Sequence, residues 1–276
     1  MMKVTERCIQ SIQVNFLGLS SKMNILVTGH RGFIGQNLVP HLQHAGHTVT
    51  GFEWGDILPD IEQYDQVIHL GAISSTTERN VEKIIAQNYR FSCNLLDLCI
   101  AYRIPFQYSS SASVYGLNQQ FTETSPVDPR TPYAWSKYMF ELYAEGKEAQ
   151  GFRYFNVYGP HEDHKGSQAS PYHQFTEQAL NTRVINVFEN SENFLRDFVP
   201  VKTVIDAHVR FMELKVSGIW NVGTGKAKSF LDVAGEVAER YNARIEYIPF
   251  PDHLKHSYQR YTCADMTNFN KAYSGV

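Results

Sequence analysis

"NILVTGHRGFIGQNLVPHLQHAGHTVTGFE", residues 24–53, holds the most informative pattern of this 276-residue chain. It begins with a short apolar run and a glycine-spaced turn. A helical stretch follows, with Ile34, Leu38 and Leu42 on one face, and a second apolar run closes the segment. This order of apolar segments is typical of a β-α-β unit. We therefore predict two parallel strands joined by a helix, with Gly46 placed to end the helix.

The same alternation continues along the chain. Further strand patterns are "YDQVIHLGA" from Tyr64, "PFQYSSSASVYG" from Pro105 and "GFRYFNVYG" from Gly151. Helical patterns begin between them, at Val81 and at Pro132. Strands that alternate with helices predict a doubly wound parallel sheet, which is a Rossmann-type α/β fold.

Composition limits the kinds of partner. With 25 basic and 28 acidic side chains the formal net charge is -3, so no overall field favours nucleic acid or an anionic membrane. No run of 18 apolar residues occurs, and residues 1–22 lack the layout of a secretory signal, so we expect a cytoplasmic protein. Because Met23 directly precedes the first strand, residues 1–22 are interpreted as an N-terminal extension of unknown role.

The four cysteines form no C-x-x-C pair and are expected to be reduced thiols: Cys8, Cys93, Cys99 and Cys263.

The turn after the first strand carries glycines three residues apart, at Gly29, Gly32 and Gly35. Glycines there let the backbone approach a pyrophosphate and direct free amides and the helix dipole at its charge. Glu53 ends the second strand, where a dinucleotide site places an acid against the ribose hydroxyls. We predict bound NAD, although Arg31 offers a cation for the extra phosphate of NADP. The other candidate cofactor-binding residues are Phe33, Ile34, Asp56, Leu70, Gly71, Ala72, Asn88, Tyr133 and Lys137.

A second group of residues suggests catalysis. "SSSASVYG" ends in a loop after Ser111, and the spacing of Tyr133 and Lys137 places both on one helix face. A nearby ammonium stabilises a phenolate, so we predict that Lys137 lowers the pKa of Tyr133. Tyr133 would then take a proton from a substrate alcohol as hydride leaves the carbon, while Ser111 binds the same oxygen. The alternative interpretation is a surface helix with a packed aromatic residue.

Together these motifs resemble the extended short-chain dehydrogenase/reductase family over nearly everything from Asn24 onward. Members of that family bind NAD(P) in a Rossmann domain and act on nucleotide sugars. "SSTTE" from Ser74, the stretch from Gly151 to Ser170, "SENFLRDFV" and "IEYIPFPD" resemble, within it, the ADP-L-glycero-D-manno-heptose 6-epimerases. The resemblance implies transient oxidation of sugar carbon six to a ketone, followed by hydride return, on an ADP-heptose substrate.

"GPHEDHKGSQAS", residues 159–170, is the most specific part of this resemblance. It implies that Lys165 is a second proton-transfer group opposite the tyrosine, each serving one epimer. Two other interpretations remain: a metal site formed by His161, Asp163 and His164, or a solvated charge run. We expect no metal. The resemblance also implies a set of substrate-binding residues: Ser74, Ser75, Thr76, Ser111, Asn156, His164, Lys165, Arg196 and Tyr258, with Asn156 and Arg196 on the diphosphate.

The resemblance also implies the domain layout. Residues 23–158 with about 198–228 would form an NAD(P)-binding Rossmann domain, and residues 159–197 with about 229–276 a smaller C-terminal substrate-binding cap. The chain is shorter than the family in three places. It lacks room for a strand and helix after Glu53, it shortens the connection after the Tyr133 helix, and we expect it to lack the final helix.

Rival functions differ at few positions. A nucleotide-sugar 4,6-dehydratase would carry an Asp-Glu pair after the catalytic Ser or Thr, where Ala112 and Ser113 stand here. A UDP-hexose 4-epimerase stays open, since Ser111 and Tyr133 suffice for its chemistry. A non-catalytic nucleotide-binding protein is the remoter alternative. We also expect a homodimer, because the helices from Val81 and from Tyr133 carry apolar surface.

Overall fold

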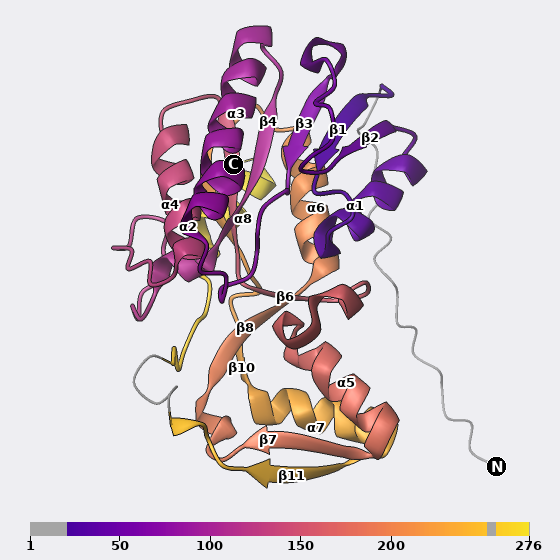
Figure 1. Cartoon of the computed structure of the whole chain (residues 1–276), viewed down its shortest axis with the longest axis vertical. Coiled ribbons are helices and arrows are strands. Elements are labelled where there is room, and N and C mark those ends of the chain that lie inside the picture. The colour runs from indigo at the N-terminus through magenta and orange to yellow at the C-terminus, as the bar shows by residue number, and fades with distance from the viewer. Residues whose placement is uncertain (1–20, 253–257, 276) are drawn as a thin grey trace, which may run out of the picture.

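A computed structural model describes residues 21–252 and 258–275. Its centre is a six-stranded sheet in the order β2-β1-β3-β4-β5-β9, and every neighbouring pair is parallel. This arrangement, in the upper half of Figure 1, confirms the predicted doubly wound α/β fold. The strands are β1 (Asn24–Thr28), β2 (Thr48–Phe52), β3 (Gln66–His69), β4 (Phe106–Ser111), β5 (Ala149–Tyr154) and β9 (Gly218–Val222).

Helices cover both faces of this sheet. Ile25 and Val27 of β1 pack into a cluster with residues of two helices on one face, while Leu26 between them joins the cluster on the other face. Successive strand residues point to opposite faces, which explains why β1 reads as an unbroken apolar run. The first face carries α1 (Phe33–His44) and α6 (Val201–Met212); the second carries α2 (Val81–Ile84), the π-helical η2 (Ile85–Arg90), α3 (Phe91–Tyr102) and α4 (Pro132–Ala144).

A smaller layer lies below the carboxyl ends of the large sheet (Figure 1). Its strands form a three-stranded sheet in the order β10-β8-β6 and a parallel pair of β7 and β11. Two helices pack against each other and against β7 in a separate apolar cluster. The elements are β6 (Asn156–Tyr158), α5 (Pro171–Thr182), β7 (Val184–Phe188), β8 (Leu195–Pro200), β10 (Ala227–Ser229), α7 (Phe230–Tyr241) and β11 (Arg244–Ile248). The sequence patterns did not predict α5, β7 or β11.

The chain was expected to be shorter than the family in three regions. Between β2 and β3 the chain forms only the 3-10 turn η1 (Ile61–Gln63), so β2 is an edge strand. After α4 the chain enters β5 within a few residues. The family's final helix was expected to be missing after the "ADMTNFNKAY" segment, and this remains a prediction. The helix α8 (Thr267–Ser274) begins within that segment. Its buried Phe269 stacks on Phe211 of α6, with ring centroids 5.5 Å apart, and this contact stabilises the short helix.

The described residues also bear on the cysteine and membrane predictions. Cys93 and Cys99 are buried, Cys263 is half-buried, and all three are free thiols. Cys8 lies outside the described residues, as does most of the N-terminal extension. Within residues 21–252 and 258–275, no helix has both the length and the apolar character that a membrane span requires.

Candidate active site

The glycine turn packs tightly against the end of β3. Gly29 has a φ of +71°, and a Cβ atom there would lie 2.6 Å from the Cα atom of Gly71. A Cβ atom on Gly35 would lie 2.3 Å from the carbonyl oxygen of Gly29. Any side chain at either position would therefore displace backbone. The turn can close only with glycine, and α1 begins directly after it, so the positive end of the helix dipole lies at the turn.

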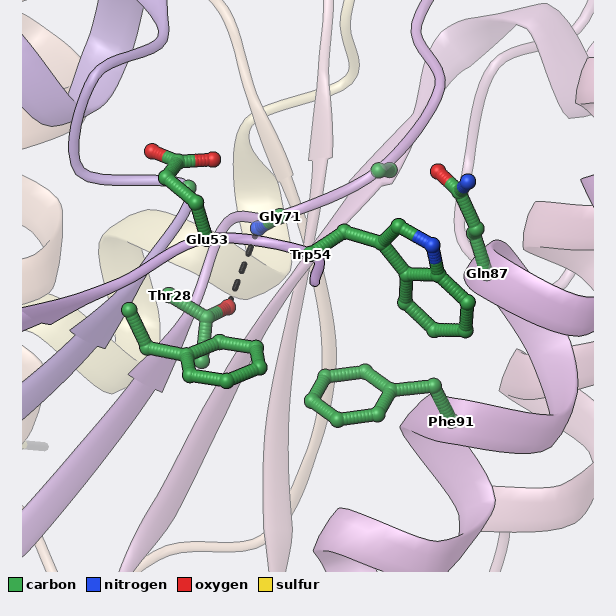
Figure 2. Close-up of a pocket in the computed structure, with 9 residues that line it drawn as sticks. Thr28, Glu53, Trp54, Gly71, Gln87 and Phe91 are labelled. Atoms are coloured by element: carbon green, nitrogen blue, oxygen red, sulfur yellow. Dashed lines mark hydrogen bonds between the residues drawn. The ribbon is translucent and has the colours of Figure 1, made fainter. Parts of the chain in front are cut away.

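A cavity of about 110 Å³ lies beside this turn, at the carboxyl ends of β1, β2 and β3. Figure 2 shows Glu53 at one side of it and the Trp54 indole between Gln87 and Phe91. The Glu53 carboxylate accepts a 2.7 Å hydrogen bond from the backbone nitrogen of Arg31, which holds the acid beside the turn. The Trp54 ring meets Phe91 edge-on, with centroids 5.6 Å apart. The lining residues are Thr28, Gly29, Phe52, Glu53, Trp54, Gly71, Ala72, Gln87 and Phe91.

These features fit a dinucleotide. A glycine cradle, an acid at the end of β2 and an apolar wall are the requirements for its pyrophosphate, ribose and adenine. Asp56 is not in the cavity lining; it accepts from the Glu53 nitrogen at 3.0 Å and so closes a turn. Trp54, Gln87 and Phe91 were missed by sequence reasoning. Of the predicted cofactor-binding residues, Gly29, Glu53, Gly71 and Ala72 line the cavity, Leu70 precedes it, and Arg31, Gly32, Phe33, Ile34 and Gly35 form the turn and the start of α1.

Asn88 braces the site from within the π-helical segment η2. Its side-chain oxygen accepts from the Ile73 nitrogen at 2.8 Å, and its amide group donates to the Ile73 oxygen and to Ser136, both at 3.0 Å. Ser136 belongs to α4 and donates in turn to the Tyr133 carbonyl at 2.7 Å. Because Asn88 is 2% exposed and fully hydrogen-bonded, it joins the loop after β3 to α4.

The ends of β4 and α4 bring the predicted catalytic residues together. Ser111 ends β4, and its hydroxyl caps the next turn by accepting from the Ser113 nitrogen at 3.2 Å. α4 begins at a Thr131 cap, which places Tyr133 in its first turn and Lys137 one turn later. The Lys137 ammonium lies 6.0 Å from the centroid of the Tyr133 ring. The structure thus groups the serine, the tyrosine and the lysine at one strand end.

The pKa of Tyr133 differs from the prediction. Burial raises the pKa of Tyr133, and a hydrogen bond with the Ser111 side chain lowers it in part. Burial also lowers the pKa of Lys137 to about 8, against the opposing charge of Glu141. The Lys137 ammonium donates to the Ser109 carbonyl and hydroxyl oxygens, at 2.9 and 3.1 Å. The predicted net lowering of the Tyr133 pKa was wrong, because burial outweighs the attraction of the phenolate to the Lys137 ammonium, which is directed at Ser109.

The Gly159–Ser170 loop places its lysine beside the cofactor turn. The Lys165 ammonium donates to the buried Glu162 carboxylate at 2.9 Å and lies 4.6 Å from the centroid of the Phe33 ring, in the first turn of α1. Ser111 and Tyr133 are not among its hydrogen-bond partners in the described part of the chain. Thr76 donates to Gln168 at 3.3 Å and so joins the Ser74–Thr76 segment to this loop. His164 is exposed, and in the described ranges no three His, Cys, Asp or Glu side chains are arranged to hold a metal ion.

A second cavity, of about 390 Å³, lies in the smaller layer. Arg196 of β8 is buried near it, with its guanidinium 5.1 Å from the Tyr258 ring and 5.6 Å from the Phe230 ring. No carboxylate of the described residues lies within ion-pair distance of Arg196, and burial lowers its pKa. A buried cation without an acid can bind a phosphate. The lining residues are Pro171, Gln174, Phe175, Gln178, Asn186, Val187, Phe188, Ser191, Phe194, Phe230, Ile248 and Tyr258.

The remaining predicted substrate residue, Asn156, is exposed at the start of β6, opposite Phe198 of β8. It therefore lies on the strand next to that of Arg196. Among the lining residues of the second cavity, sequence reasoning found only Tyr258. Most of the others come from α5, β7 and the η5 turn (Ser191–Asn193), whose patterns are weak, while Phe194 precedes β8, Phe230 begins α7 and Ile248 ends β11.

A parallel sheet with a glycine turn, an acid after β2 and a Ser-Tyr-Lys cluster at the carboxyl end defines a Rossmann-type dinucleotide-binding protein with an oxidoreductase-like site. Comparison with known proteins agrees. The model of the NAD-dependent epimerase/dehydratase family matches residues 25–223, and the chain belongs to that family. The nicotinamide dinucleotide cofactor predicted from the sequence is thereby confirmed.

Solved structures of several epimerases are similar along almost the whole chain. ADP-L-glycero-D-manno-heptose-6-epimerase of Helicobacter pylori is 27% identical, with a TM-score of 0.81, over 92% of this chain and 90% of that one. UDP-glucose 4-epimerase of Thermotoga maritima is also 27% identical, with a TM-score of 0.78, over 91% and 93%. UDP-glucose 4-epimerase of Thermus thermophilus, solved with NAD, is 26% identical, with a TM-score of 0.72, over 88% and 90%.

Proposed function

We propose that this protein is an NAD(P)-dependent nucleotide-sugar epimerase that inverts carbon six of an ADP-heptose. The observation that carries the proposal is the second amine: Lys165 is held at the first turn of α1, on a different element from Tyr133 of α4. Inversion through a ketone needs proton transfer at the same oxygen in two orientations of the sugar. The similarity to the Helicobacter pylori enzyme over nine-tenths of both chains supports the same reaction.

Each of these residues has a separate role in the proposed reaction. Bound NAD would supply the acceptor and donor of hydride for the sugar carbon. Tyr133 exchanges the hydroxyl proton of one epimer and Lys165 that of the other, while Ser111 hydrogen-bonds the same oxygen. Arg196 binds the diphosphate, because its buried guanidinium has no acidic partner among the described residues. The aromatic cavity beside it receives the nucleoside.

The test is turnover of ADP-D-glycero-D-manno-heptose by the purified protein. The expected product is the carbon-six epimer. Tyr133→Phe should lower the rate by roughly a hundredfold or more while cofactor binding is retained. Failure to convert this sugar would contradict the proposal.

UDP-hexose 4-epimerase is the second candidate, favoured by the equal identity of the Thermotoga maritima enzyme. Ser111 and Tyr133 suffice for that reaction, and Lys165 has no part in it. Conversion of UDP-glucose, unaffected by Lys165→Met, would establish this alternative. A dehydratase is disfavoured because Ala112 and Ser113 follow Ser111. Full cellular function of Tyr133→Phe would indicate a non-catalytic nucleotide-binding protein.

Assembly and location belong to the same proposal. α3 and α4 lie side by side on one flank (Figure 1) and carry exposed apolar side chains, among them Leu98, Trp135 and Leu142. We expect this flank to pair with a second copy of the chain. The cytoplasmic location and the two-part domain division expected from the sequence remain predictions.

A further inference from the structure

The Gly159–Ser170 loop contains a carboxylate to which sequence reasoning gave no role. The Glu162 side chain is completely buried and accepts four hydrogen bonds. One carboxylate oxygen accepts from the Gly159 nitrogen at 3.1 Å and the Ser170 hydroxyl at 2.7 Å. The other accepts from the Ser170 nitrogen at 2.7 Å and the Lys165 ammonium at 2.9 Å. A buried charge is tolerated when it is paired and hydrogen-bonded in this way.

The same loop is fixed to the helices that flank the cofactor turn. The Asn37 side chain of α1 donates to the Pro160 carbonyl at 2.9 Å. At Gly159, with a φ of +158°, an added Cβ atom would lie 2.6 Å from a Val201 methyl of α6. Both ends of the loop are also joined through Glu162, which bonds Gly159 and Ser170. Glu162 therefore has a fixed frame from which to hold Lys165.

Lys165 itself stays accessible. Its side chain is 22% exposed, whereas that of Glu162 is 0% exposed. An ammonium has three donors, and the described residues occupy one of them, so two remain for a ligand. The Phe33 ring beneath the ammonium faces it at 4.6 Å and limits where the amine can go. The ion pair of Glu162 and Lys165 thus directs the Lys165 ammonium to the space beside the cofactor turn.

We propose that Glu162 is a positioning residue that holds the Lys165 amine for proton exchange with the sugar hydroxyl, on the side opposite Tyr133; this rests on the proposed function. In the oxidation step the hydroxyl proton would pass to the Lys165 nitrogen, while bound NAD would supply the acceptor for the hydride, so that a ketone is left. Reduction reverses both transfers. Glu162 stays ionised and forms no bond to the substrate.

The electrostatics agree with this role. Burial alone would raise the pKa of Glu162, but hydrogen bonds from Ser170 and Lys165 outweigh it and lower the pKa below its ordinary value. The carboxylate is therefore charged at neutral pH and attracts the amine. Other ionisable groups near the loop are His161 and His164, both exposed, and His173 of α5, which lies 3.9 Å from Asp163.

The test compares the two epimers in the oxidation half-reaction. ADP-D-glycero- and ADP-L-glycero-D-manno-heptose are mixed separately with the NAD-loaded protein, and the absorbance of the reduced nicotinamide is followed. The measured quantity is the initial burst of reduced nicotinamide. In Glu162→Gln the burst formed from one epimer should fall by about tenfold or more. The burst formed from the other epimer should stay within about twofold, because Tyr133 still exchanges its proton. A merely structural role would lower both bursts equally.

Matched variants separate the possible outcomes. Lys165→Met should reproduce the asymmetry, and Glu162→Asp, which keeps the charge on a shorter side chain, should restore part of the lost burst if Glu162→Gln folds poorly. Lys202→Met breaks an exposed pair with Asp206 on α6 and should change neither burst. Equal loss for both epimers in Glu162→Gln and Glu162→Asp, or no loss at all, would overturn the positioning role. Unchanged bursts in Lys165→Met would instead refute the proposed function.

Discussion

Tyr133 and Lys137 interact less directly than their spacing suggests. Burial raises the pKa of the phenol, and the Lys137 ammonium is hydrogen-bonded to Ser109. The reactive phenolate is therefore scarce near neutral pH, and any cation within several ångströms affects its population. With a pKa of about 8, Lys137 is itself charged below that pH. In the proposed reaction, the reactivity of Tyr133 depends on the balance between burial and nearby charge.

A substitution at Lys137 tests that balance. Because we propose the Tyr133 phenolate as the proton acceptor, the rate of sugar oxidation should rise with pH. Lys137→Met removes a cation that favours the phenolate. The rise of the oxidation rate with pH should therefore occur about one pH unit higher in this variant. The measurement is the oxidation half-reaction across a pH series. Lys147→Met is the control, since its ammonium lies over Tyr143 instead. A rise at an unchanged pH would contradict the role given to Lys137.

At the scale of elements, the strongest patterns came from segments buried on both sides. β1 and β3 are almost wholly buried, so their apolar runs and the glycine turn between strand and helix are easy to recognise. α5 buries only Phe175 and Ala179, and no residue of β11 is fully buried. Such segments have little apolar periodicity, and they form because neighbouring elements cover them. This explains why the Rossmann elements were predicted and much of the cap was not.

The candidate site divides in the same way. Gly29, Ser111 and Tyr133 belong to short local motifs, so their positions follow from the sequence alone. Trp54 meets Phe91, and Arg196 meets Tyr258, only because distant segments come together in the fold. No local spacing encodes those contacts. The sequence therefore predicts the motifs, while the walls of both cavities require the structure.

Trp54 provides a test of the cofactor cavity. Its indole lies at the end of edge strand β2, where a further strand and helix are absent, and forms part of the cavity wall. We expect NAD to quench tryptophan fluorescence in the unmodified protein, and the quenching to be lost in Trp54→Phe. The affinity should weaken by roughly threefold to tenfold, since an aromatic contact with adenine is reduced.

Trp135→Phe is the matched control for this titration. Trp135 is 50% exposed, against 52% for Trp54, but it lies on α4. Its replacement should leave both the quenching and the affinity unchanged. If Trp54→Phe kept the full quenching, the adenine would lie elsewhere.

At the scale of the whole molecule, the chain passes between its two layers more than once. β5 completes five strands of the large sheet, and β6, α5 and β7 then build the smaller layer. α6 returns to pack on α1, and β9 adds the sixth strand. The cofactor turn and the Arg196 cavity are thereby held in different layers of one chain. The proposed nucleotide-sugar substrate would have to contact both layers.

The assembly follows from the exposed flank of α3 and α4. We predict a dimer in solution, and substitution of Leu142 by Glu should convert it to a monomer by placing a charge within the interface. Light scattering after size exclusion gives the mass of both forms. Leu180→Glu is the control, because Leu180 is 53% exposed on α5 in the other layer. A monomeric mass for the unmodified protein would contradict the prediction.

In the proposed reaction the sugar is oxidised and then reduced at one carbon by a returning hydride, and protons are exchanged from two sides. The most direct measurement follows a deuterium label at carbon six of ADP-D-glycero-D-manno-heptose through complete epimerisation in ordinary water. The product epimer is expected to keep the label at carbon six, because the hydride returns to the carbon that it left. Loss of the label to solvent during inversion would contradict the proposed reaction.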